Sequence, residues 1–138
     1  MITLFKYGIN EICDEFPDIC KSVFGEFTYE GNCPSEVYLG YEEECFLGFI
    51  SGYIVSPNTW YLQRAGFKIG KQGNVGNLRK YLEALSKIHE EYGFILTRVI
   101  NTDIKPLKMD IMAGFIIIGI RQDTSGKLWV ELIHKKEN

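Results

Sequence analysis

Residues 37–67 contain three runs rich in β-branched and aromatic residues, separated only by short turns. The runs are Val37–Tyr41, Cys45–Val55 and Trp60–Phe67, and the turns between them are Glu42–Glu44 and Ser56–Thr59. Strands joined by connections this short pair in antiparallel fashion. The segment therefore predicts a three-stranded antiparallel meander, and this feature limits the possible folds more than any other part of the chain.

A glycine-rich segment, residues 68–77, follows the third strand and leads directly into an amphipathic helix. Apolar residues recur at helical spacing from Leu78 to Tyr92, and Gly93 ends the pattern. Glycines allow close approach of a backbone to a ligand, and N–H groups at a helix start can hold an anion. Such loops are also common without a ligand, so phosphate binding is one of two interpretations. The candidate residues are Lys71, Gly73, Asn74, Val75, Gly76 and Asn77.

Further elements are expected on both sides of this central segment. The expected strands are Ile2–Tyr7, Phe94–Ile100, Phe115–Ile120 and Leu128–Ile133. A helix is expected from the N-cap Asn10 to Phe16, a second from Pro17 to Gly25, and a short third one between Asp103 and Gly114. The order β-α-α-β-β-β-α-β-α-β-β predicts a single α/β domain over residues 1–138.

Composition excludes several classes of protein. The net charge of −3 disfavours nucleic-acid binding as the main role, and no apolar run reaches the length of a membrane helix. We therefore expect a cytoplasmic protein with no nucleic-acid or membrane partner. Residues 1–44 hold ten Asp or Glu against two Lys, whereas residues 45–138 hold thirteen Lys or Arg against eight Asp or Glu. This asymmetry indicates either ordinary solvated surface or one half suited to anions and one suited to cations.

The cysteines and histidines do not form a metal-binding pattern. No two cysteines have C-x-x-C spacing, and neither histidine stands among acidic residues or cysteines at ligand spacing. Cys13 and Cys20 are seven residues apart, which predicts that they share a buried helical face. We expect no metal site.

Three local patterns resemble the GNAT superfamily of acyl-CoA-dependent N-acyltransferases. The first is the hairpin of residues 37–52, where an acidic turn precedes Phe46-Leu47-Gly48-Phe49-Ile50. The second is the strand, glycine-rich loop and Leu-rich helix of residues 60–92. The third is Asn101 followed by a short helix and Ala113-Gly114-Phe115-Ile116-Ile117-Ile118-Gly119. The compact chain looks like members carried by bacteriophages. The resemblance implies an α/β (α+β) fold with a mixed, strongly twisted sheet of about seven strands and helices on both faces.

The resemblance also implies an acetyl-CoA-dependent N-acetyltransferase in which an amine attacks the thioester directly. The pantetheine arm would lie beside the strand that contains Ala65, Gly66 and Phe67, the pyrophosphate would lie on residues 71–77, and Asn101 would make a further cofactor contact. A backbone N–H of the same strand would polarise the thioester oxygen. Tyr61 and Gln63 could position a water for catalysis, although a packing role for Tyr61 is an equal alternative.

Two positions depart from the family pattern. The loop does not match Gln/Arg-x-x-Gly-x-Gly/Ala in any register. Counted from Lys71, Asn74 and Gly76 occupy the glycine positions, whereas with the Leu-rich helix in family register Gly76 and Leu78 occupy them. Either the loop is longer than usual or its phosphate-binding pattern is degraded. In addition, Asp110 stands where many members carry the tyrosine that protonates the departing thiolate. An aspartate at the surface would be ionised at neutral pH and a poor proton donor, so Asp110 is predicted to be dispensable.

The acceptor is predicted to be a cationic amine, either a small molecule or a protein. In the family the first two helices form one wall of the acceptor groove, and here that wall carries Glu15 and Asp18. An acidic helix that simply faces solvent is the alternative. A homodimer is possible. The alternative function is a non-catalytic CoA-binding or virion-associated module, favoured by the imperfect loop and the missing tyrosine.

Overall fold

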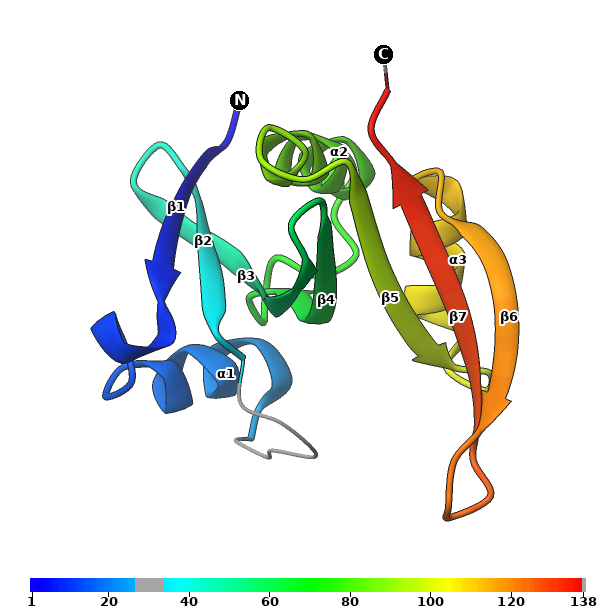
Figure 1. The fold of residues 1–138 in the computed structure, drawn as a ribbon. Helices are drawn as coiled ribbons and strands as arrows, with labels where there is room; N and C mark the ends of the chain where they lie inside the picture. The colour runs from blue at the N-terminus through cyan, green and yellow to red at the C-terminus, as the bar shows by residue number, and fades with distance from the viewer. Residues whose placement is uncertain (27–33, 138) are drawn as a thin grey trace.

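The computed structural model describes residues 1–26 and 34–137. Seven strands form one sheet in the order β1-β2-β3-β4-β5-β7-β6, and three α-helices and a short 3₁₀ helix connect them (Figure 1). The strands are β1 (Thr3–Gly8), β2 (Glu36–Glu42), β3 (Cys45–Ser56), β4 (Thr59–Phe67), β5 (Phe94–Ile100), β6 (Ile116–Gln122) and β7 (Leu128–Lys135). The helices are η1 (Ile9–Glu11), α1 (Phe16–Phe24), α2 (Asn77–Ile88) and α3 (Ile104–Met112).

The sheet consists of two antiparallel parts joined by one parallel pair. Strands β1 to β4 pair in antiparallel fashion, which confirms the predicted meander, and β5, β7 and β6 form the second antiparallel part. Between the two parts, β4 and β5 run parallel because α2 provides the crossover that a parallel connection requires. The predicted mixed sheet of about seven strands is therefore confirmed.

Helices cover both faces of the sheet, as predicted. Alternate residues of a strand point to opposite faces, and in β2 this places Val37 on the α1 side and Tyr38 on the α2 side. The face with α1 buries Phe16, Cys20 and Val23 against β2 and β3. The opposite face holds the larger core, in which α2 packs over the centre of the sheet and the end of α3 packs beside it. Residues of this core include Trp60, Leu62, Tyr81, Leu85, Ile88, Ile95, Ala113, Phe115 and Leu132.

The helix expected from Asn10 to Phe16 is wrong. Ile9–Glu11 forms a single 3₁₀ turn in which the Glu11 carboxylate accepts a hydrogen bond from the Gly8 N–H at 2.8 Å, and α1 begins only at Phe16. Pro17 lies in the first turn of α1, where its missing N–H costs nothing. Gly25, with φ of 78°, ends this helix as expected.

The two cysteines of this region do not share a face. Because residues 12–15 form turns rather than a helix, Cys13 is exposed while Cys20 is fully buried. Cys45 is exposed as well, and Cys33 lies outside the described residues. Among the residues that the structure describes, no group of three or more His, Cys, Asp or Glu could hold a metal ion.

A chain of hydrogen bonds through two histidines ties the C-terminal ends of α2 and α3 to β7. His89 Nδ1 bonds the Tyr92 carbonyl at 2.8 Å, His89 Nε2 bonds His134 Nδ1 at 2.8 Å, and His134 Nε2 bonds the Ala113 carbonyl at 3.0 Å. Burial lowers the pKa of His89, which favours the neutral form of this ring. The sequence places these residues 45 positions apart and gave no signal for this contact.

Candidate active site

The most unusual feature of the sheet is the short pairing between β4 and β5. Only Thr59, Trp60 and Tyr61 of β4 pair with β5, opposite Phe94–Leu96, although both strands continue. Just beyond this point, the Thr97 hydroxyl donates to the Leu62 carbonyl at 2.9 Å. Ala65–Phe67 then pair with β3 on one side only, and within residues 1–26 and 34–137 no strand pairs with their other edge. That edge presents backbone donors and acceptors toward β5.

A bulge lies where the two strands diverge. The register between β3 and β4 shifts between Ser51 and Gly52, and one extra residue, Gln63, enters β4 at this position. Bulges redirect the backbone and are over-represented beside active sites. Tyr61 is the last residue of β4 paired to β5, and it lies two residues before Gln63. Both predicted catalytic candidates therefore lie at the point of divergence.

Tyr61 also has a packing role, which was the alternative interpretation. Its ring stacks on Tyr53 with centroids 5.1 Å apart. Burial is the main cause that raises the pKa of Tyr61, while nearby Arg98 opposes the rise. The phenol is therefore protonated at neutral pH, which suits a hydrogen-bond donor and does not suit a base.

Glycines fix the position of the free edge of β4. A side chain at Gly48 of β3 would collide with the Gly66 carbonyl, and a side chain at Gly66 would collide with Val23 of α1. Helix α1 and strand β3 therefore pack directly against the C-terminal end of β4. This close packing fixes the position of the Ala65–Phe67 backbone relative to α1 and β3.

The loop after β4 turns through three glycines with left-handed backbone conformations. Gly70, Gly73 and Gly76 adopt positive φ angles of 94°, 71° and 91°, and Gly76 is the N-cap of α2. Space beside each of their Cα atoms is open. Within the described part of the chain, no intramolecular acceptor takes the N–H groups of residues 73–76. These amides and the start of α2 fit a phosphate group.

Two side chains hold this loop in place. Asn77 is buried, and its amide donates to the Lys71 carbonyl at 2.9 Å, so its side chain closes the loop. Gln72 donates to the carbonyls of Val23 at 3.0 Å and Phe67 at 3.1 Å, which ties the loop to the ends of α1 and β4. Gln72 was missed by the sequence interpretation, because its partners are distant carbonyls that no spacing pattern reveals.

The positive charge around the loop is smaller than the sequence suggested. Lys68, Lys71 and Arg79 are exposed near the N-terminus of α2, whereas Lys80 forms an ion pair with Glu42 at 3.4 Å. Val75 is fully exposed at the tip of the loop. Asn101 is exposed in the turn after β5, at the same end of the strands as the loop.

The expectation that Asp110 lies at the surface is wrong. Its side chain is only 7% exposed, and its carboxylate accepts a hydrogen bond of 2.7 Å from the Tyr81 hydroxyl. Burial raises the pKa of Asp110 from 3.8 to about 6, against the opposing effect of this hydrogen bond. Burial and the Asp110 charge also raise the pKa of Tyr81 well above its usual value. The pair joins α2 to α3, the helices that follow the two diverging strands.

The acidic residues predicted to face the acceptor lie at the start of α1. Glu15 is the N-cap residue and Asp18 lies in the first turn, and both are exposed. Val23, which contacts Gly66, lies at the other end of this helix. Helix α1 thus contacts β4 through its C-terminal end, and the two carboxylates lie at its N-terminal end, away from β4.

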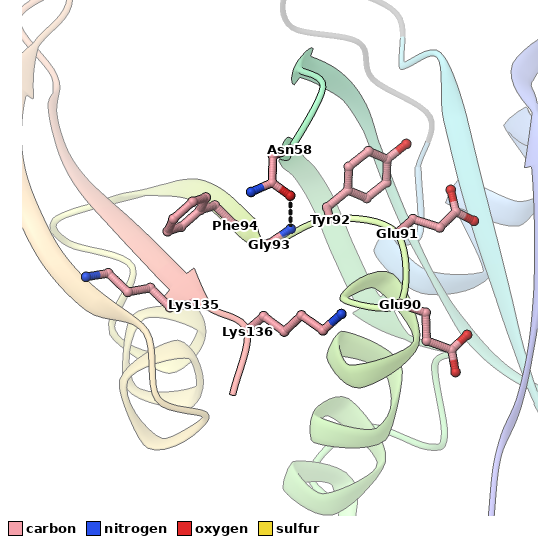
Figure 2. Close-up of a pocket in the computed structure, with 8 residues that line it drawn as sticks. All are labelled: Asn58, Glu90, Glu91, Tyr92, Gly93, Phe94, Lys135 and Lys136. Atoms are coloured by element: carbon pink, nitrogen blue, oxygen red, sulfur yellow. Dashed lines mark hydrogen bonds between the residues drawn. The ribbon is translucent and has the colours of Figure 1, made fainter. Parts of the chain in front are cut away.

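A separate surface pocket of about 400 Å³ lies at the opposite end of β5 (Figure 2). It is bordered by Asn58, Tyr92, Gly93 and Phe94, and by charged side chains of Glu90, Glu91, Lys135 and Lys136. The side-chain Oδ1 of Asn58 accepts a hydrogen bond from the Gly93 N–H at 2.8 Å. Because β5 begins here and diverges from β4 at its other end, this pocket is distinct from the candidate active site.

The fold is that of the GNAT acetyltransferases. The ribosomal-protein-S18-alanine N-acetyltransferase of Escherichia coli superimposes with a TM-score of 0.69 at 15% identity, covering 98% of this chain and 94% of that one. An acetyltransferase of Bacillus subtilis in complex with CoA gives 0.68 at 17% identity, covering 99% of this chain and 98% of that one. A GNAT-family acetyltransferase of Bacillus cereus ATCC 10987 also gives 0.68 at 17%, covering 100% and 99%.

Sequence comparison gives no match beside this structural likeness. No family model matches the chain, and no curated protein does. In the described residues, no helix is long and apolar enough to cross a membrane. The likeness therefore establishes the fold, and the function has to be argued from the site.

Proposed function

We propose that this protein is an acetyl-CoA-dependent N-acetyltransferase that acts on a primary amine. The observation that carries the proposal is the free backbone edge of Ala65–Phe67 leading into the glycine loop at the start of α2. An edge of this kind pairs with an amide-containing chain as it would with another strand. The N–H groups at the end of that edge then suit a pyrophosphate. One ligand with both parts in this order is CoA, and the B. subtilis neighbour is a complex with CoA.

The chain's own residues then have separate tasks. The cofactor supplies a thioester whose acyl carbon is open to attack by the amine. The backbone of Ala65–Phe67 holds the pantetheine amides, and Gly73–Gly76 hold the phosphates. Asn101, at the same end of the sheet, adds a cofactor contact. Near the bulge, a β4 backbone N–H would donate to the thioester oxygen and stabilise negative charge there.

Proton transfer is assigned to groups around this edge. As the C–N bond forms and the C–S bond breaks, the amine loses one proton and the sulfur gains one. Tyr61 and Gln63, at the point of divergence, position the water that accepts the amine proton. Asp110 occupies the family's tyrosine position and is buried with a raised pKa, so it is suited to hold the proton that the sulfur takes.

A thermal-shift titration with acetyl-CoA and CoA, followed by a thiol-release assay over a panel of amines, tests the proposal. Binding should raise the melting temperature in proportion to ln(1 + [L]/Kd). Desulfo-CoA should stabilise the protein as CoA does, whereas pantetheine without phosphates should stabilise it less. An unchanged melting temperature at millimolar CoA would refute the proposal.

The second candidate function is a non-catalytic CoA-binding or virion-associated module. The observation that favours it is the loop, in which no register supplies both family glycines and only part of the family pattern is present. Such a module would give the thermal shift without releasing thiol from acetyl-CoA in the presence of any amine. A cytoplasmic, phage-encoded setting suits both functions and remains a prediction.

The acceptor proposed for the enzyme is a cationic amine. The support is the negative charge of residues 1–44, including exposed Glu15 and Asp18 on α1. Attraction of this kind is screened over about 8 Å at physiological salt, so the KM for a cationic amine should rise with salt. The double variant Glu15→Gln/Asp18→Asn should raise that KM several-fold at low salt, with Glu90→Gln/Glu137→Gln as the control of equal charge change. Equal effects of the two double variants would show that only net charge matters.

A further inference from the structure

The edge strand β6 exposes isoleucines on both of its faces. The exposed fractions are 56% for Ile116, 49% for Ile117, 56% for Ile118 and 68% for Ile120. Ile116 and Ile117 are neighbours in the strand and face opposite sides of the sheet, and the register with β7 shifts between Ile117 and Gly119. Within residues 1–26 and 34–137, neither face of β6 is fully covered. In the part of the chain that the structure describes, only β7 pairs with β6, and its outer edge carries no strand (Figure 1).

The other edge of the sheet shows how this chain protects an exposed strand. Strand β1 carries Lys6 at its centre, and the ammonium group forms ion pairs with Glu36 at 2.9 Å and Glu91 at 2.7 Å. A lysine on an edge strand discourages pairing with another chain. Strand β6 has no charged residue before Arg121 and no proline. The isoleucines on both sides of its register shift against β7 remain exposed. An exposed apolar edge strand of this kind is prone to pair with another strand or to aggregate.

The apolar surface continues from β6 onto the neighbouring helix. Ile111 and Met112, at the end of α3, are 47% and 57% exposed, and they precede β6 by only a few residues. Leu128, at the start of β7, is 40% exposed. Exposed apolar surface of this extent on one part of a protein marks an interaction site.

We propose that β6 pairs with β6 of a second copy of this chain, antiparallel and about a two-fold axis. The partner strand must be apolar on both faces, and β6 itself meets this requirement. Antiparallel pairing places the Arg121 side chains at opposite ends of the interface, whereas parallel pairing would set them side by side. Each Arg121 retains its ion pair with Glu131 of its own chain at 3.4 Å. The two sheets then form one continuous sheet, with the isoleucines of both copies buried together.

Sedimentation velocity and light scattering measure this directly. The wild-type protein should have twice the chain mass of 15.9 kDa, and Ile118→Lys should be monomeric because the dimer would bury two unpaired charges. We expect the dimer dissociation constant to rise by about 100-fold or more. The matched control is Ile54→Lys, since Ile54 is a strand residue on β3 whose exposure, 52%, is close to the 56% of Ile118. This control should remain dimeric.

A second measurement keeps the test valid if Ile118→Lys folds poorly. Amide hydrogen exchange of residues 116–122 in the wild type should slow with rising protein concentration, whereas exchange of β1 should not. A wild type that is monomeric at 100 times its working concentration would overturn the proposal, as would a dimer that both lysine variants retain. Binding of a monomeric wild type to neutral phospholipid vesicles would also overturn it. None of these results depends on CoA or on an amine.

Discussion

Substitution of Asp110 should have opposite effects on stability and on activity. In the folded protein the pKa of this carboxyl is about 6, compared with 3.8 for an accessible aspartate. The folded state therefore holds the proton more tightly than the unfolded state, and the protein loses stability as pH rises from about 4 to about 6. The difference corresponds to about 3 kcal/mol above pH 6. Asp110→Asn removes this cost, because it carries no charge at any pH.

The expected result is a gain that depends on pH. At pH 8 the free energy of unfolding of Asp110→Asn should exceed that of the wild type by about 1–3 kcal/mol. The lower value applies if the buried Asn side chain lacks hydrogen-bond partners of its own. At pH 4.5 most of this gain should disappear. Urea unfolding at the two pH values measures it, and Asp103→Asn, at the exposed start of the same helix, is the control. A gain that is equal at both pH values, or a loss at pH 8, would contradict the burial argument.

The same variant tests the proposed proton transfer. If Asp110 supplies a proton to the departing sulfur, kcat should fall at least about tenfold, or about 1.4 kcal/mol, in Asp110→Asn. The wild-type kcat should also decline as pH rises past about 6, with that inflection absent in the variant. A stabilised variant with unchanged kcat would show that the Asp110–Tyr81 pair is structural only.

Two further predictions concern the loop and the histidine pair. Gly76→Ala places a side chain at a φ of 91° and should weaken CoA binding at least about tenfold, as measured by thermal shift. The control is Gly126→Ala, which places a side chain at a φ of 87° in the β6–β7 turn and should leave CoA binding unchanged. Equal effects of the two variants would show that the phosphates bind elsewhere. A carbonyl can only accept, so the bonds to the Tyr92 and Ala113 carbonyls each need a ring N–H. The bond between the two rings needs one more N–H, so three of the four ring nitrogens must carry a proton. Nitrogen NMR at pH 5 should therefore show three protonated ring nitrogens, and only two would mean that one of these bonds is absent.

The sequence predicted the strands well because each one carries its own local signal. The meander of β2, β3 and β4 follows from short turns between β-rich runs, and the helical spacing of α2 survives in the structure. The segment after Asn10 was mispredicted because Ile12 and Phe16 fit a helix by spacing alone. In the structure both are buried, Ile12 directly after the 3₁₀ turn and Phe16 as the first residue of α1.

The site was predictable only where it depends on local backbone chemistry. The glycines of the loop were visible in the sequence, but the burial of Asp110 depends on Tyr81, which is 29 residues away. Asp110 precedes two apolar residues that are themselves exposed, so its local sequence gave no indication of which face of α3 is buried. An inference from the usual pKa of aspartate therefore led to the wrong expectation.

The proposed site coincides with the weakest junction of the sheet. Only three residue pairs hold β4 to β5, and the backbone of Ala65–Phe67 has no strand beside it in the described chain. Backbone donors and acceptors that lack partners cost free energy unless water or a ligand satisfies them. A ligand that pairs with this edge completes the sheet as a further strand would, and links the part with α1 to the part with α3. Saturating CoA, at 100 times its Kd, should stabilise the fold by about 2.7 kcal/mol, and slower amide exchange should appear in both β4 and β5. Protection confined to the loop would mean that the phosphates bind while the edge of β4 stays open.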